Sequence, residues 1–546
     1  MPDPTSTNPL LTPGVPIRFD RIGAEHVEPG LRALLALAKS RLDALAQSRG
    51  PRTFETTLGA LEATTERLEL AMDLVEHLES VATTPALRSA YNAIQPEVSA
   101  FFSSIALSEG VWNALKEYAA TEEARSLEGA RRRFLDKTIA DFRRSGADLD
   151  AAGKQRLEGI DVELARLTLR YGQNVLDSTN AFELCVDDAS RLAGLPQSAI
   201  DAARESAAAK GLPGYRLTLQ APSYVPVMTY LDDATIRERM YRASNNRATS
   251  GAVDNRPLVR KILELRREKA KLLGYSNFAD LVCEDRMAKS GAQARRFVST
   301  LRDRALPFFE RENAELEAFR RELEGAGAPS LAPWDVPYYA EKLRRARYDF
   351  DEEAIRPFFA LDRVLDGVFA IAARLYGVRI EPWPDAPVWH PSVRAYSIHE
   401  ENGSLSARFY VDAFPREAKR DGAWMHGLVS STGEGREHLE ILVGNFTPPL
   451  AGGSSLLRHR EVETLFHEFG HLMHHASSRV EIRSLAGTSV ARDFVELPSQ
   501  IMENWCWELD ALELFARHHE TDAPLPADVF GRMRAARTFR AANAMM

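Results

Sequence analysis

The chain has 546 residues, of which 45% are hydrophobic and 27% are charged, so it is long enough for several domain-sized units with a large core. A net charge of −9, without basic runs interleaved with aromatic residues, argues against nucleic acid as the main partner. No apolar run reaches the length of a membrane span, and residues 1–6 lack the charged and apolar regions of a signal peptide. We therefore expect a cytoplasmic protein that does not enter a membrane.

Residues 1–150 are expected to form an N-terminal helical region. Apolar residues recur there at helical spacing, and similar segments continue to about Arg144. The two clearest stripes are Leu31, Leu34, Leu35, Ala38, Leu42 and Leu45, and then Leu58, Leu61, Leu68, Met72, Val75 and Leu78. Such stripes predict helices that pack through one face, and they indicate no chemistry. Residues 145–148 break the pattern and mark the end of the region.

The rest of the chain divides into residues 151–220, read as connecting helices, and residues 221–546, read as the catalytic domain. In the connecting part we expect a long helix over about 152–175 and a strand over 215–219. The catalytic part opens with a proline-containing loop at 222–226. Its first helices are predicted at about 233–247, 256–271 and 292–323.

A small antiparallel sheet is predicted directly before the motif described next. Residues 393–398 and 405–411 alternate as strands do, on either side of the turn signal Asn402-Gly403. Residues 441–446 predict a further strand. Its segment 444–447 is our candidate for an exposed edge that pairs with an extended peptide, and the alternative is a strand that only braces the next helix.

Residues 463–471 read E-T-L-F-H-E-F-G-H and contain the motif H-E-x-x-H. On a helix, residues four apart share a face, so His467 and His471 could bind one metal ion while Glu468 transfers a proton. Gly470 is a poor helix former, by about 1 kcal/mol relative to alanine, which indicates a close approach to the backbone. The apolar face of this helix is Val462, Leu465, Phe466, Phe469, Leu472, Met473 and Ala476. The alternative is a surface helix with two solvated histidines.

A catalytic zinc ion needs a third protein ligand and one open position. The pattern H-E-x-x-H-x-x-G-x-x-H is excluded, because His474 and Ser477 occupy its glycine and its last histidine. Glu496 is the remaining candidate. A chain reversal around Gly487 and a second helix continuing over 501–515 would bring it to the first helix. On its own, Glu496 could equally be an ordinary exposed acid.

The run F-H-E-F-G-H, followed by D-F-V-E-L-P-S-Q-x-M-E-N-W-C-W-E, resembles the thimet oligopeptidase family of zinc metallopeptidases. The likeness extends to further motifs at residues 8–13, 222–230, 388–394 and 419–425. The resemblance implies a mainly α-helical fold, with two helical lobes flanking a deep channel that admits short unstructured peptides. It implies one Zn²⁺ per chain, bound by His467, His471 and Glu496, with Glu468 as the catalytic carboxylate.

The expected function is therefore zinc-dependent endopeptidase activity on short oligopeptides, in cytoplasmic peptide turnover, by a monomer without nucleic acid or membrane partners. In this chemistry zinc acidifies its bound water and polarises the scissile carbonyl, and Glu468 acts as general base and then as general acid. Zinc-binding histidines also need acceptors for their second nitrogen. The candidates are Glu463, Asp493, Ser499 and Gln500, each of which could equally be a solvated surface residue.

One departure from the family pattern concerns the C-terminal end. Family members continue past the position matching 535–546, whereas this chain ends in what reads as a helix over 532–546. The family's further segment carries a glycine- and tyrosine-rich loop, from which a tyrosine stabilises the oxyanion. Three hypotheses follow, of which the first two are an active zinc oligopeptidase, with or without a separate C-terminal fragment that completes it, and a catalytically impaired peptide- or metal-binding fragment. A different zincin with similar ligand spacing is the third.

Overall fold

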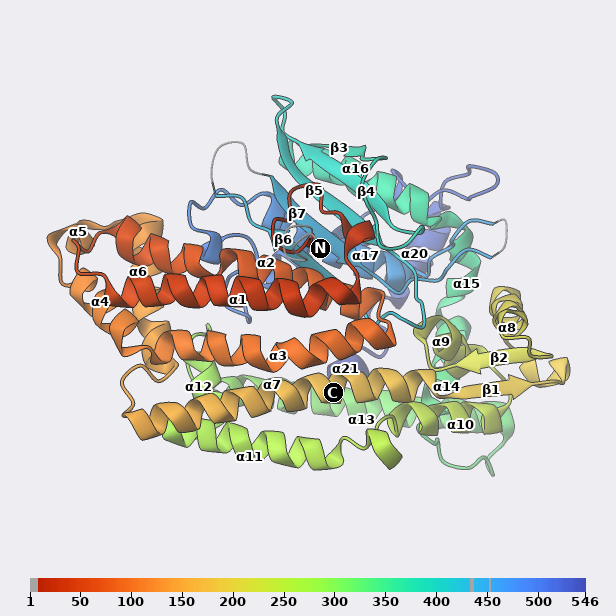
Figure 1. Ribbon diagram of the computed structural model, residues 1–546. Coiled ribbons are helices and arrows are strands. Elements are labelled where there is room, and N and C mark those ends of the chain that lie inside the picture. The colour runs from red at the N-terminus through yellow and green to blue at the C-terminus, as the bar shows by residue number, and fades with distance from the viewer. Residues whose placement is uncertain (1–7, 433–436, 451–452) are drawn as a thin grey trace.

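The computed structural model describes residues 8–432, 437–450 and 453–546. The chain is mainly α-helical with one five-stranded and one two-stranded sheet, which confirms the predicted fold class (Figure 1). Within the described part of the chain, no helix combines the length and apolarity needed to cross a bilayer.

The N-terminal region is a layer of long helices that lie side by side in Figure 1. α1 packs against α2 and α3, and α3 packs against α7. Both predicted stripes face this core, with every residue buried except the half-buried Met72. The helices are α1 (Ala24–Gln47), α2 (Ala60–Val81), α3 (Pro85–Leu107), α4 (Glu109–Ala119), α5 (Glu122–Ser126), α6 (Gly129–Arg144) and α7 (Ala151–Asn180).

A small α/β unit follows α7, with its own apolar core. Strands β1 (Glu183–Val186) and β2 (Tyr215–Thr218) pair antiparallel, accompanied by α8 (Gln197–Ala209), α9 (Ala221–Tyr230) and α10 (Ala234–Asn245). The loop predicted at 222–226 is wrong, because these residues begin α9. Pro222 sits in the first helical turn, where its missing N–H costs nothing, and burial of Pro226 outweighs its poor helix propensity.

Further helices lead from this unit to the main sheet. α11 packs on α7, and α13 packs on α14. The bounds of α11 and α13 agree closely with the helices predicted at 256–271 and 292–323. They are α11 (Arg256–Leu272), α12 (Phe278–Cys283), α13 (Gly291–Glu324), α14 (Val336–Tyr348), α15 (Glu352–Ile355) and α16 (Leu361–Tyr376).

The five-stranded sheet has the order β3-β4-β5-β7-β6. All neighbours are antiparallel except β5 and β7, which run parallel. The expected edge at 444–447 is wrong, because β7 ends at Val443 between two partners and the edge strands are β3 and β6. The strands are β3 (Arg379–Pro382), β4 (Arg394–His399), β5 (Leu405–Asp412), β6 (Trp424–Val429) and β7 (His438–Val443).

The sheet joins the two main cores of the molecule. Leu439, Ile441 and Val443 on β7 pack with the N-terminal helices, whereas Leu442 packs on the opposite face, with the helices of the C-terminal part. Because successive strand residues point to opposite faces, one fully buried strand serves both cores. The sheet therefore fixes the position of α17 relative to the N-terminal region.

The last helices carry the H-E-x-x-H motif and Glu496. The second helix, expected to carry Glu496 and to continue over 501–515, starts at Glu496 and packs on α17, but it already ends at Glu503. The helix expected over 532–546 is two helices, with Arg540 between them in a left-handed conformation. They are α17 (His459–Ala476), α18 (Glu496–Glu503), α19 (Leu509–Leu512), α20 (Ala527–Ala536) and α21 (Ala541–Met545).

Candidate metal centre

Helix α17 buries one face and presents two histidines on another. Its predicted apolar face, from Val462 to Ala476, is buried at every position. The side chains of His467 and His471 remain 24% and 12% exposed, and their rings lie 5.0 Å apart. The helix is therefore held by the core while both imidazoles stay accessible to an ion.

Gly470 allows α18 to approach α17 closely. A Cβ atom at this position would lie 2.6 Å from Ser499 Cα and 2.9 Å from the Pro498 carbonyl oxygen. Real side chains do not tolerate such contacts with backbone atoms, so only glycine fits here without displacing α18. This confirms the close backbone approach predicted from the sequence, and it brings Glu496 to the histidines.

The three predicted ligands meet at one point. Glu496 Oε2 lies 3.1 Å from His467 Nε2 and 3.1 Å from His471 Nε2. A tetrahedral zinc ion with bonds of about 2.0–2.1 Å holds its donors roughly 3.3 Å apart, close to what is seen. Two nitrogens and one carboxylate oxygen are also a donor set typical of catalytic zinc.

The partners of His467 support a cation at this point. Its Nδ1 atom lies 2.7 Å from Glu503 Oε1, while Nε2 faces Glu496. A neutral imidazole carries one N–H group and so satisfies only one of these carboxylates. A metal ion between Nε2 and Glu496 would satisfy the second contact and leave Nδ1–H to Glu503, the usual arrangement of a metal-bound histidine.

The sequence pattern does not single out Glu503. It lies two helical turns after Glu496 on α18, and that spacing could have identified it once α18 was known to begin at Glu496. Among the four candidates named instead, only Ser499 touches a ligand: its hydroxyl donates to Glu496 Oε2 over 3.1 Å.

The other three candidates lie elsewhere. Glu463 accepts a hydrogen bond from Trp507 Nε1, and Asp493 accepts from the backbone N–H groups of Met287 and Ala288. Gln500 makes no side-chain hydrogen bond within the described ranges. His471 Nδ1 is buried and likewise has no hydrogen-bond partner there.

Glu468 is buried beside the ligands, with 6% of its surface exposed. Burial raises the pKa of Glu468 to about 7, and the charge of Glu496 adds to the rise, while His467 and the backbone N–H of Met425 oppose it. A divalent cation at the ligands would stabilise the carboxylate and lower this pKa. The arrangement thus places a carboxylate that can gain and lose a proton near neutral pH next to the cluster.

In a second cluster of potential ligands, formed by His438, Glu440 and His475, the ring nitrogens of both histidines are used in protein hydrogen bonds, although Glu440 Oε2 has no partner among the described residues. His438 Nδ1 accepts from the Ser431 N–H over 3.1 Å, and its Nε2–H faces the Ser478 carbonyl oxygen at 3.1 Å. Neither nitrogen keeps a free lone pair for a metal. We therefore assign this cluster to the packing of β7 against α17.

Known proteins resemble this chain over nearly its whole length. The model of “Peptidase family M3” matches residues 227–546, and that of “Neurolysin/Thimet oligopeptidase, N-terminal domain” matches residues 31–154. Oligopeptidase A of Escherichia coli (strain K12) is 38% identical over 546 residues, covering 98% of this chain and 80% of that protein. A dipeptidyl carboxypeptidase of Salmonella typhimurium is 34% identical, covering 98% and 79%. A solved structure of PZ peptidase A with an inhibitor shares the fold, with TM-score 0.53 and 14% identity over 96% of this chain and 74% of that one.

Proposed function

Because the chain belongs to peptidase family M3, we propose that it is a zinc-dependent endopeptidase that hydrolyses short, unstructured oligopeptides, as its similarity to oligopeptidase A suggests. The observation that carries the proposal is the convergence of His467, His471 and Glu496 on one point, with Glu468 adjacent. We further propose that the protein acts as a cytoplasmic monomer. The matches at 31–154 and 227–546 support a division into residues 1–150, 151–220 and 221–546.

His467, His471 and Glu496 would hold one zinc ion, which supplies Lewis-acid chemistry when bound. Glu503 keeps the His467 ring oriented through Nδ1, and Ser499 does the same for the Glu496 carboxylate. Glu468 accepts a proton from the attacking water and later delivers it to the leaving amine nitrogen. Its burial suits both steps, because burial raises the carboxyl pKa and so opposes the lowering that a bound cation causes.

The substrate backbone would pair with β6, the edge strand nearest Glu468. β6 bonds to β7 on one side only, and its Met425 N–H points to Glu468. Pairing through backbone groups binds peptides of varied sequence, which suits turnover of mixed oligopeptides. A cavity of about 500 Å³ lies along β6, between it and α2, and offers room for an extended chain and not for a folded protein.

The test compares the wild-type protein with Glu468→Gln. Hydrolysis of quenched fluorescent peptides should fall by roughly 10²–10⁴-fold in the variant, because the general base is lost. Zinc content should stay at one ion per chain, since the three ligands remain. A chelator should abolish the wild-type activity, and Glu513→Gln, an exposed acid, should behave as wild type.

Two outcomes would contradict the proposal. A metal-replete protein without stoichiometric zinc would refute the metal site. Stoichiometric zinc without hydrolysis of any peptide would favour the alternative of a protein that binds peptide or metal without catalysis.

A further inference from the structure

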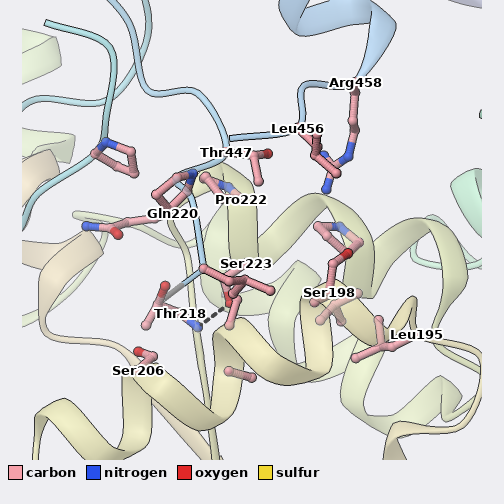
Figure 2. A pocket seen from close by; sticks show the side chains of 18 of the residues that line it. Leu195, Ser198, Ser206, Thr218, Gln220, Pro222, Ser223, Thr447, Leu456 and Arg458 are labelled. Carbon is pink, nitrogen blue, oxygen red and sulfur yellow. Dashed lines mark hydrogen bonds between the residues drawn. The ribbon is translucent and has the colours of Figure 1, made fainter. Parts of the chain in front are cut away.

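A second cavity lies between the small α/β unit and the segment that leads into α17, and Figure 2 shows it from close by. Its volume is about 320 Å³, within the range of pockets that bind small molecules. Most of the wall is apolar, supplied by α8 and α9 on one side and by residues 447–450 and 453–456 on the other. The main apolar residues are Leu195, Ala199, Pro226, Val227, Leu450 and Leu456.

Arg458 is the unusual residue in this wall. Its side chain is only 12% exposed, yet its guanidinium makes no hydrogen bond to any residue in the described ranges. The Nε atom is fully buried, and its nearest carboxylate oxygen, Glu353 Oε1, is 3.6 Å away. Figure 2 shows the guanidinium beside Leu456, directed into the cavity towards Ser198. A buried cation with unused donors indicates an absent anionic partner.

The charges at this end of the cavity support an anion. Glu353 already pairs with Arg356, whose Nη1 lies 2.7 Å from Glu353 Oε2. Arg356 also donates to Ser198 Oγ and to the Leu456 carbonyl oxygen, so its donors are used. Two guanidinium groups therefore share one carboxylate, and the net charge of these three side chains is one positive unit.

We propose that this cavity binds a small amphipathic monocarboxylate. The carboxylate would accept hydrogen bonds from Arg458, and an acyl chain would lie against Leu195, Ala199 and the prolines of the wall. A single negative charge balances the excess positive charge, whereas a phosphate monoester would bring about two. A chain of about eight to ten carbons suits a cavity at the small end of the usual range for ligands. The proposal is independent of the peptidase function, because it uses none of the metal ligands.

The experiment is isothermal titration calorimetry of the full chain with decanoate below its micelle concentration. Three probes separate the contributions: decanol keeps the tail without charge, decyltrimethylammonium carries a positive head, and acetate has the head without the tail. We expect one decanoate per chain, at least tenfold weaker binding of decanol, and no detectable binding of the other two. Decanoate should also raise the thermal unfolding midpoint, because it binds only the folded chain.

Two variants locate the site. Arg458→Met removes the charge and keeps the length, and Ala199→Phe fills the cavity; each should weaken decanoate binding at least tenfold. Arg460→Met, an exposed arginine two residues on, is the matched control and should bind decanoate as wild type does. If Ala199→Phe does not fold, the comparison of Arg458→Met with Arg460→Met alone tests whether decanoate binds in this cavity.

Three results would overturn the proposal. If decanoate binds the Arg458 and Ala199 variants as tightly as it binds the wild-type protein, it binds the exposed apolar surface and not this cavity. Equal binding of decyltrimethylammonium would exclude recognition of the carboxylate. Tighter binding of decyl phosphate than of decanoate would make the ligand a phosphate and not a carboxylate.

Discussion

At the scale of single residues, two of the three proposed ligands have hydrogen-bond partners, His467 through Glu503 and Glu496 through Ser499. Glu503 accepts from His467 Nδ1 over 2.7 Å, and we expect Glu503→Gln to lower zinc affinity by about 10–100-fold, because the charged acceptor that orients the ring is lost. Competition against a chelator of known affinity measures this. Glu508→Gln, an exposed acid nearby, should leave the affinity unchanged. An equal loss in both variants would show a general effect of charge and not an orienting role.

Buried His77 makes the stability of the folded protein depend on pH. It is buried against Phe19 and Trp389, neither ring nitrogen has a partner among the described residues, and burial lowers its pKa to about 3. The unfolded chain binds this proton below about pH 6.5 and the folded chain does not, so stability falls as pH drops from 6.5 towards 3. His77 accounts for a loss of about 2 kcal/mol by pH 5.

His77→Phe removes this titration and keeps an aromatic ring in the same place. We expect the variant to be more stable than wild type, with a larger difference at pH 5 than at pH 7.5. Urea unfolding midpoints at both pH values measure it. The same difference at the two pH values would show that His77 does not titrate as its burial implies.

The sequence predicts the site residues that are spaced along one helix. It does not predict the residues whose role depends on how two helices pack against each other. His467, His471 and Glu468 follow from the period of α17, and the structure brings Glu496 to them as expected. Glu503 could not be predicted in the same way, because its role depends on where α18 begins and on which face of α18 meets α17.

At the scale of elements, the contact between α17 and α18 depends on Gly470. Alanine is the better helix former by about 1 kcal/mol, but its Cβ would meet Ser499 Cα and the Pro498 carbonyl oxygen. We therefore expect Gly470→Ala to lower both the unfolding midpoint and the zinc affinity, because α18 must move away with Glu496. Gly531→Ala in α20 is the control: no atom lies within 4 Å of its Cβ position, so it should stabilise slightly. A Gly470→Ala protein that binds zinc as wild type does would contradict this account.

Sequence patterns predicted long helices better than short elements. α13 was placed within one residue at each end, because its apolar period persists over many turns. The sequence does not predict strand β6, since His426 and Gly427 interrupt its alternation, and the prolines of α9 predict a loop where the chain forms a helix. In both cases tertiary packing decides the conformation, and a local pattern does not show it.

At the scale of the whole molecule, the sheet connects the N-terminal helices to α17, and one buried charge cluster secures that connection. Asp412, at the end of β5, accepts hydrogen bonds from Arg416 and from Lys419. Arg416 also donates to the Val81 carbonyl oxygen at the end of α2. Burial disfavours the charged form of Asp412. The two cations nevertheless hold the pKa of Asp412 below its usual value, so its carboxylate is charged in the folded protein.

Lys419 is the member of this cluster whose loss should matter most. Its ammonium group is fully buried and donates to Asp412 Oδ1 and to the carbonyl oxygens of Asp412, Phe414 and Gly444. Lys419→Met keeps the length but removes one of the two cations that pair with buried Asp412, so we expect a loss of about 3–5 kcal/mol in the free energy of unfolding at pH 7.

Lys210→Met is the matched control, because Lys210 pairs with Glu417 while 45% of its side chain is exposed to solvent. A pair of that kind contributes less than about 1 kcal/mol. Urea unfolding followed by far-ultraviolet circular dichroism compares the two variants with wild type. Because Lys419 bonds to the ends of both β5 and β7, its loss should loosen the sheet that supports α17, and zinc affinity should fall together with stability. Equal, small effects of the two substitutions would show that the N-terminal region and the sheet are held together by apolar contacts alone.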